Sequence, residues 1–193
     1  MEPKRAHWAA AKHVLRYIQG TIEHVLKYTQ GNDIGLSGFT DADWAGSSID
    51  RKSTRGYCFS IGSGKTSWCS RKKKSVALSS AEAKYMAAST ASCEAIWLRK
   101  LLVNLLKEKM EATYILCDNQ SCIKLSENPV LHDRSKHIDI RCHFIRDCVQ
   151  RGVVQLKYIP TGEQVANILT KAPSKIKFTY FREKMGMVKN PFQ

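Results

Sequence analysis

Three acidic residues stand at positions from which a folded chain can bring carboxylates together. Asp41 lies in the motif Gly-Phe-Thr-Asp-Ala-Asp-Trp-Ala-Gly at a predicted strand end, Glu82 begins a long apolar-periodic stretch, and Asp118 follows the run Tyr-Ile-Leu-Cys. Carboxylates that meet at one edge of a sheet repel one another unless a cation lies between them. Oxygen-rich sites of this kind suit Mg²⁺, which accepts carboxylate and phosphate oxygens. The pattern therefore indicates metal-assisted cleavage of a phosphodiester.

Each acidic residue also has an alternative interpretation. Ser79 and Glu82 match the capping box, in which the glutamate only bonds the first backbone amide of a helix. Asp118 precedes a short predicted helix and can be its N-cap. Asp43 can replace Asp41 as the first carboxylate, because residues two apart on a strand share a face, but it lies beyond the expected strand end. The spacing alone leaves these alternatives open.

The charge of the chain indicates a polyanionic partner. The 193 residues carry a formal net charge of +14, with 43% hydrophobic and 25% charged residues, which is typical of a globular domain with appendages. Nucleic acid is the first candidate for so basic a chain. The run Arg71-Lys72-Lys73-Lys74 interrupts a predicted strand near the acidic residues, and it is either a phosphate contact or a solvated surface.

The number of cysteines and the lack of a long apolar segment indicate where in the cell the protein is expected. No run of 18 apolar residues exists, and the first residues lack the apolar core of a signal peptide, so neither a membrane span nor secretion is predicted. Seven cysteines, an odd number, indicate a reducing intracellular setting. Zinc ligands can be imagined at Cys117/Cys122 and at Cys142/His143/Cys148, but these spacings contain no Cys-x-x-Cys knuckle and favour buried free thiols.

The elements that must position these residues form a mixed α/β pattern. Apolar periodicity and turn residues predict six strands, over residues 25–28, 36–41, 56–62, 66–70, 113–117 and 153–159. The strand over 66–70 is expected to resume at residues 75–78. Helices are predicted over residues 7–19, 80–106, 118–125, 138–149 and 163–171. This order predicts a mixed sheet flanked by helices. The first helix carries an apolar stripe that needs a partner.

Four motifs in this order resemble a known family. Thr-Asp-Ala-Asp-Trp-Ala-Gly, Leu-Ser-Ser-Ala-Glu-Ala-Lys-Tyr, Cys-Asp-Asn-Gln-Ser and Lys-His-Ile-Asp-Ile-Arg-x-His-Phe-Ile-Arg are similar to the ribonuclease H (RNase H) domain of Ty1/copia-type retrotransposon Pol polyproteins. The likeness covers residues 35–172, residues 1–34 resemble the end of the reverse transcriptase region, and residues 173–193 are expected to be a basic C-terminal tail. The resemblance implies an RNase H-like fold with a five-stranded mixed sheet flanked by helices.

The resemblance also implies a site and a reaction. Two Mg²⁺ ions, or Mn²⁺ in their place, would be held at four positions, namely Asp41, Glu82, Asp118 and Asn167. The ions would support cleavage of the RNA strand of an RNA–DNA hybrid. The family has an aspartate at the fourth position, so Asn167 weakens the expected metal site, and Glu163 is the side chain that could lean in instead. A reverse transcriptase region of a fuller polyprotein is the expected partner, in a cytoplasmic virus-like particle or in the nucleus.

Three functional interpretations follow. The first is a working nuclease for RNA–DNA hybrids. The second is a truncated, catalytically impaired transposon remnant that binds nucleic acid without cutting it. The third, a basic DNA-binding module built on the first helix, lacks any recognisable recognition element.

Overall fold

The centre of the protein is a five-stranded mixed sheet. The computed structural model describes residues 2–31, 35–107, 109–128 and 139–191, with side chains described from residue 144 in the last range. The strand order is β4-β3-β2-β5-β6, in which the first three strands are antiparallel and β5 and β6 run parallel to β2. The strands are β2 (Leu36–Ala42), β3 (Thr54–Ile61), β4 (Gly64–Lys72), β5 (Thr113–Cys117) and β6 (Val154–Tyr158). The predicted sheet is confirmed.

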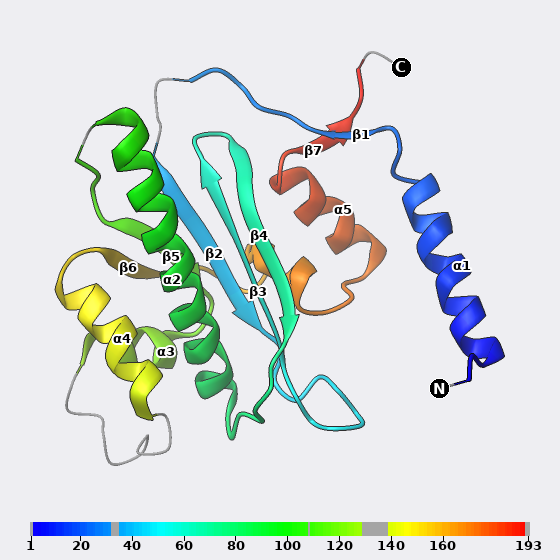
Figure 1. The fold of residues 1–193 in the computed structure, drawn as a ribbon, viewed down its shortest axis with the longest axis horizontal. Helices are drawn as coiled ribbons and strands as arrows, with labels where there is room; N and C mark the ends of the chain where they lie inside the picture. Colours follow the sequence, from blue (N-terminus) through cyan, green and yellow to red (C-terminus); the bar gives the residue numbers. More distant parts are fainter. Residues whose placement is uncertain (1, 32–34, 108, 129–138, 192–193) are drawn as a thin grey trace.

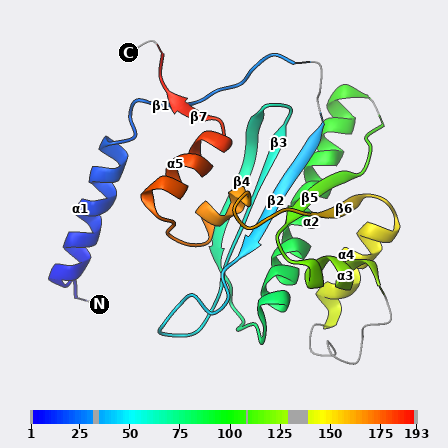
Figure 2. The ribbon, with the colours of Figure 1, turned by 180° about the vertical axis from the view of Figure 1, so that it is seen from behind.

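Helices cover both faces of this sheet (Figures 1 and 2). One face carries α2 (Ser80–Leu106), α3 (Gln120–Glu127) and α4 (Asp139–Gln150), and the other carries the short 3₁₀ helix η2 (Val165–Leu169) and α5 (Lys175–Lys184). The face of α2 toward the sheet is lined by small residues, among them the fully buried Ala88, Ala91 and Ala95. Small side chains let the helix backbone approach the sheet, where Phe59 and Ile115 fill the core.

Two predicted elements differ from those observed. The strand β4 does not resume at 75–78. The amide of Lys73 still bonds the carbonyl of Ser53 at 2.8 Å, and the chain then bends at residues 74–75 and leads into α2. The helix expected over 163–171 is reduced to η2. Its N-cap is Gln164, whose side-chain amide donates to the carbonyls of Thr40 and Leu116, both at 3.1 Å. These bonds fix the start of η2 across the ends of β2 and β5.

Two short segments, one near each end of the chain, pair outside the main sheet. The strand β1 (His24–Leu26) pairs antiparallel with β7 (Met187–Lys189), and Phe181 of α5 is buried at 1% exposure. The segment expected to be a basic tail therefore contains a packed helix and a paired strand. The two boundaries between the three predicted segments stay predictions.

The first helix, α1 (Arg5–Gln19), stands apart from the sheet (Figure 1). None of its residues is buried, and Trp8 and Leu15 on its apolar stripe are 65% and 63% exposed. The partner that this stripe needs is therefore not among the described residues. None of the helices in the described ranges combines the length and apolar character needed to cross a membrane.

Candidate active site

Two of the predicted carboxylates meet at one edge of the sheet. Asp41 lies near the end of β2, and Asp118 directly follows β5, its parallel neighbour. Because neighbouring parallel strands end at the same edge, the two carboxylates come together there, with side-chain exposures of 0% and 1%. The alternative in which Asp118 caps α3 is wrong, because the N-cap is Asn119, whose Oδ1 accepts from the amide of Cys122 at 2.8 Å.

A lysine lies between these carboxylates. The Nζ of Lys84, in the second turn of α2, is 3.0 Å from Oδ1 of Asp41 and also bonds Oδ1 of Asp118. Burial by itself lowers the pKa of Lys84, but the two carboxylates outweigh it and raise this pKa above its ordinary value. The other oxygen of each carboxylate accepts from a threonine hydroxyl: Thr170 donates to Asp41 at 2.6 Å, and Thr161 donates to Asp118 at 2.9 Å.

Asn167 joins this cluster from η2. It is 3% exposed, and its Nδ2 donates to the backbone carbonyl of Thr161 at 2.9 Å. Its Oδ1 is buried and has no hydrogen-bond partner among the described residues. The close approach of η2 depends on Gly56, which pairs with Asp41 across β2 and β3, because a Cβ there would lie 2.7 Å from the Cβ of Leu169. The fourth predicted position is thus linked to both aspartates through Thr161 and Thr170, whose hydroxyls bond Asp118 and Asp41.

Glu82 is oriented differently from the two aspartates. Its carboxylate accepts from the amide of Leu78 at 2.6 Å, and its own amide donates to the hydroxyl of Ser79 at 3.1 Å. The Ser79 half of the predicted capping box is therefore present, while the glutamate bonds the amide one residue earlier. Glu82 is 6% exposed and begins the same helix that carries Lys84.

Two further acidic residues were alternatives for the site. Asp43 accepts from the amide of Thr54, and burial together with the nearby Asp41 raises the pKa of Asp43 above its ordinary value. Glu163 accepts a hydrogen bond from the hydroxyl of Tyr180 on α5. Both carboxylates are thus held by partners outside the Lys84 cluster.

The residues as arranged do not form a divalent cation site. Within the described part of the chain, no three His, Cys, Asp or Glu side chains are close enough to share a metal ion. Asp41 and Asp118 supply oxygens of the kind Mg²⁺ prefers, and Oδ1 of Asn167 is a buried oxygen without a hydrogen-bond partner among the described residues. The ammonium of Lys84 nevertheless occupies the space between the carboxylates.

The chain resembles known retrotransposon proteins along nearly its whole length. No protein-family model matches it. It is 41% identical over 189 residues to the retrovirus-related Pol polyprotein from transposon RE2 of Arabidopsis thaliana, covering 98% of this chain. It is 43% identical over 189 residues to the corresponding polyprotein from transposon TNT 1-94 of Nicotiana tabacum, covering 97% of this chain. Over nearly its whole length, the chain is therefore similar to a segment of retrotransposon Pol polyproteins.

The chain spans only 13% and 14% of the length of these two relatives. The resemblance read from the motifs is thereby confirmed. Among solved structures, LC11-RNase H1 in complex with an RNA/DNA hybrid aligns with a TM-score of 0.49 and 13% sequence identity, over 70% of this chain and 93% of that chain.

The four residues of the basic run 71–74 have different surroundings. Arg71 and Lys74 are exposed. Lys72 forms an ion pair with Asp50 at 2.9 Å. Lys73 is buried, its ammonium donates to the carbonyl of Ala83, and burial lowers its pKa to about 8. The run is therefore not a uniform surface, and only part of it faces solvent.

The cysteines lie mostly in the core. Cys117, Cys122 and Cys148 are buried among apolar side chains, and the thiols of the first two interact with each other. The side chains of Cys142 and His143 lie outside the described residues.

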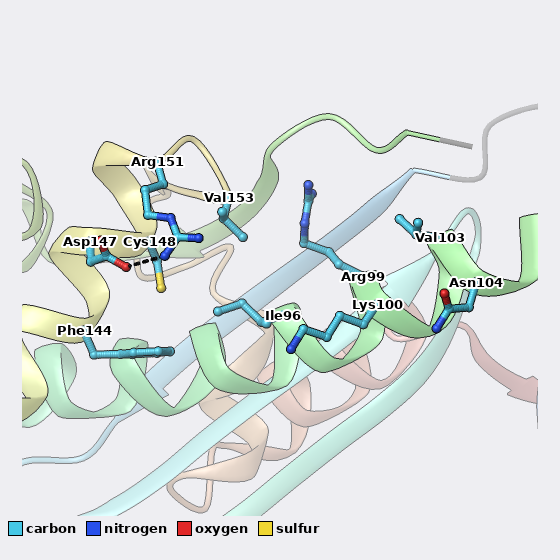
Figure 3. A pocket seen from close by; sticks show the side chains of 10 residues that line it. All are labelled: Ile96, Arg99, Lys100, Val103, Asn104, Phe144, Asp147, Cys148, Arg151 and Val153. Atoms are coloured by element: carbon cyan, nitrogen blue, oxygen red, sulfur yellow. Dashed lines mark hydrogen bonds and ion pairs between the residues drawn. The ribbon is translucent and has the colours of Figure 1, made fainter. Parts of the chain in front are cut away.

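A separate pocket of about 530 Å³ lies between α2 and α4 (Figure 3). Ile96 and Phe144 contribute apolar walls. Arg99 donates to backbone carbonyls between α2 and β5, and Arg151 pairs with Asp147 at 3.1 Å. Because its arginines bond within the fold and none of the predicted site residues lines it, we assign this pocket no chemistry.

Sequence reasoning missed three residues of the cluster: Lys84, Thr161 and Thr170. The only local signal was the position of Lys84, two residues after Glu82 in a motif that already suggested a site. The threonines gave no signal, because Thr170 reaches Asp41 across 129 positions of sequence.

Proposed function

We propose that the chain is the RNA–DNA hybrid nuclease segment of a retrotransposon Pol polyprotein. Its active site would consist of Asp41, Glu82, Asp118 and the Asn167 position. The observation that carries this proposal is the pair of buried carboxylates at the edge where β2 and β5 end, each held by a threonine hydroxyl. Two buried carboxylates are costly without a cation, which here is the ammonium of Lys84, and their pairing with one favours a role of this edge in binding cations.

The proposal includes a nucleic acid surface. The net charge of +14 favours a polyanion. The exposed Arg71 lies in β4 and the exposed Lys74 follows it, and β3, the neighbour of β4, pairs with β2. A hybrid would lie with a backbone phosphate at the carboxylate edge. A reverse transcriptase region of a longer polyprotein, and a cytoplasmic virus-like particle or nuclear location, belong to the same proposal.

Magnesium is part of the proposal under one condition. Bound there, Mg²⁺ would activate water and offset charge on the phosphate. The residues do not hold such an ion while the Lys84 ammonium lies between the carboxylates. Hydrolysis therefore requires that Lys84 leave this place.

A second candidate function is binding of nucleic acid without cleavage. Two observations favour it: an amide replaces a carboxylate at Asn167, and the Lys84 ammonium already pairs with both aspartates. Both reduce the attraction of the site for a divalent cation, because they lower its negative charge.

A cleavage assay and a binding assay on the same hybrid separate these functions. The RNA strand is labelled, and the protein is incubated with Mg²⁺ or Mn²⁺, with Asp118→Asn as the control for contaminating nuclease. Cleavage by the natural chain and not by the control supports the nuclease. Binding measured by fluorescence anisotropy in EDTA, with no metal-dependent cleavage, supports the binding remnant. Neither binding nor cleavage would overturn both.

A further inference from the structure

We propose that Lys84 is a built-in counter-ion that occupies the cation position between Asp41 and Asp118 and competes with divalent cations for it. The proposal rests on the proposed function only in treating this edge of the sheet as a cation site. It makes Lys84 a residue that sets metal affinity, and through it the concentration of metal at which the centre can work.

The geometry of the lysine is that of a bound cation. Its Nζ contacts one oxygen of each aspartate, and its side chain is 14% exposed between carboxylates that are 0% and 1% exposed. Its backbone belongs to the start of α2, which is fixed by the Ser79 cap and by the bond from Lys73 to the carbonyl of Ala83. The side chain is therefore delivered to the sheet edge by a rigid element.

Each oxygen of the two carboxylates has a polar neighbour, although Oδ1 of Asp41 makes only the ion-pair contact with Lys84 and no hydrogen bond among the described residues. The Oδ1 atoms face Lys84, and the Oδ2 atoms accept from Thr170 and Thr161. A divalent ion that bridged the two Oδ1 atoms would have to lie where the ammonium now lies. Lys84 and the metal ion therefore exclude each other from the same place.

The charges of the cluster point the same way. A second lysine, Lys171, lies with its Nζ 3.9 Å from Oδ2 of Asp41. Two carboxylates and two ammonium groups leave no formal net charge, although Lys171 is 47% exposed and is screened by solvent. An approaching divalent cation is thus attracted strongly only after Lys84 has moved away. The apparent association constant of the metal ion is the intrinsic constant multiplied by the fraction of molecules in which Lys84 is displaced.

A purely structural lysine, which only ties α2 to the sheet, is the competing interpretation. Both interpretations predict that removal of the ammonium destabilises the metal-free protein, because two buried carboxylates lose their partner. Only the counter-ion interpretation predicts that a divalent metal ion replaces the missing charge. The response to metal therefore decides between them.

The experiment compares three forms of the full chain by thermal melting and by Mn²⁺ titration calorimetry: the natural protein, Lys84→Met, and Lys100→Met. Lys100 is an exposed lysine on the same helix and serves as the matched control. In EDTA we expect Lys84→Met to melt of the order of 10 °C lower than the natural chain. We expect it to bind Mn²⁺ about tenfold or more tightly, and to recover thermal stability on Mn²⁺ addition.

An Mn²⁺ affinity of Lys84→Met no tighter than that of the natural chain would overturn the proposal, as would an equal gain with Lys100→Met. If Lys84→Met does not fold, the natural chain is reductively methylated and the modification of Lys84 is quantified by mass spectrometry. Lys84 should be modified slowly in EDTA and several-fold faster in saturating Mn²⁺. Equal modification in both conditions would contradict displacement.

The failure of the proposed function gives a different result. If no form binds Mn²⁺, including Lys84→Met combined with Asn167→Asp, this edge is not a cation site and the nuclease proposal fails. If the natural chain binds Mn²⁺ as tightly as Lys84→Met, the cation site stands and only the role of Lys84 is wrong.

Discussion

Replacement of Asn167 by aspartate tests the fourth position of the site directly. In the natural chain the Nδ2 of Asn167 donates to the carbonyl of Thr161 at 2.9 Å, in a side chain that is 3% exposed. An aspartate has no hydrogen to donate, so a carboxylate oxygen would face that carbonyl. It would also add a negative charge beside Asp41 and Asp118. We therefore expect Asn167→Asp to destabilise the metal-free protein.

The magnitude follows from two contributions. Loss of the hydrogen bond costs about 1 kcal/mol, and a buried carboxylate with poor compensation costs several kcal/mol more. We expect a total of about 3–5 kcal/mol, which corresponds to a fall in melting temperature of the order of 10 °C for a chain of this size. A divalent ion present at a hundred times its dissociation constant would return about 2.7 kcal/mol. Asn167→Asp should therefore be unstable in EDTA and largely recovered in Mg²⁺.

The assay is thermal melting in EDTA and in a Mg²⁺ series, followed by hybrid cleavage. If the fourth carboxylate completes the site, the cleavage rate should rise by roughly 10²–10³, the usual value of one interaction that stabilises transition-state charge. As a control, Asp41→Asn in the same background should abolish the gain. A variant that melts like the natural chain in EDTA and does not respond to Mg²⁺ would show that Asn167 does not face the centre.

Three further predictions concern the surface, the C-terminal segment and pH. Replacing Arg71 and Lys74 together with glutamine should weaken hybrid binding and reduce the slope of log K against log salt by about 2, whereas an unchanged slope would make them solvated surface. Phe181→Ala should cost about 3–5 kcal/mol of unfolding free energy in denaturant, because this ring is 1% exposed, and a loss below about 1 kcal/mol would place α5 outside the cooperative fold. A hydrogen bond from Ser47 and the ammonium of Lys72 on β4 lower the pKa of Asp50. The stabilisation that the ionised Asp50 gives the folded protein is therefore present above about pH 4 and is lost as the pH falls further. The difference in melting temperature between Asp50→Asn and the natural chain should accordingly disappear in strong acid, and a difference that persists there would refute the ion-pair explanation.

The sequence by itself determined the family and most of the elements. The motif around Asp41, the Ser-Ser-Ala-Glu motif and the Cys-Asp-Asn motif supported the correct family, and the strand expected at 113–117 is observed with those bounds. Alternation and caps are local properties, so they predict where strands and helices lie. The mixed sheet followed from the order of these elements.

Local patterns were ambiguous where one residue could satisfy two roles. Asp118 and Asn119 both suit an N-cap, and only the structure shows that Asn119 caps α3 while Asp118 faces Lys84. Lys73 was grouped with three other basic residues, yet it is buried against the start of α2. A run of charges in sequence does not specify which members the turn after β4 will bury.

The composition of the site was decided by tertiary structure. Asp41 and Thr170 are 129 positions apart, and Lys84 and Asp118 are 34 apart, so no local pattern relates them. They meet because β2 and β5 end at one edge, α2 starts beside it, and Gly56 lets η2 pack closely. The sequence could name the carboxylates, since their chemistry is visible in residue type. Which cation lies between them depends on how four separate elements pack, and in this chain the packing places the ammonium of Lys84 there.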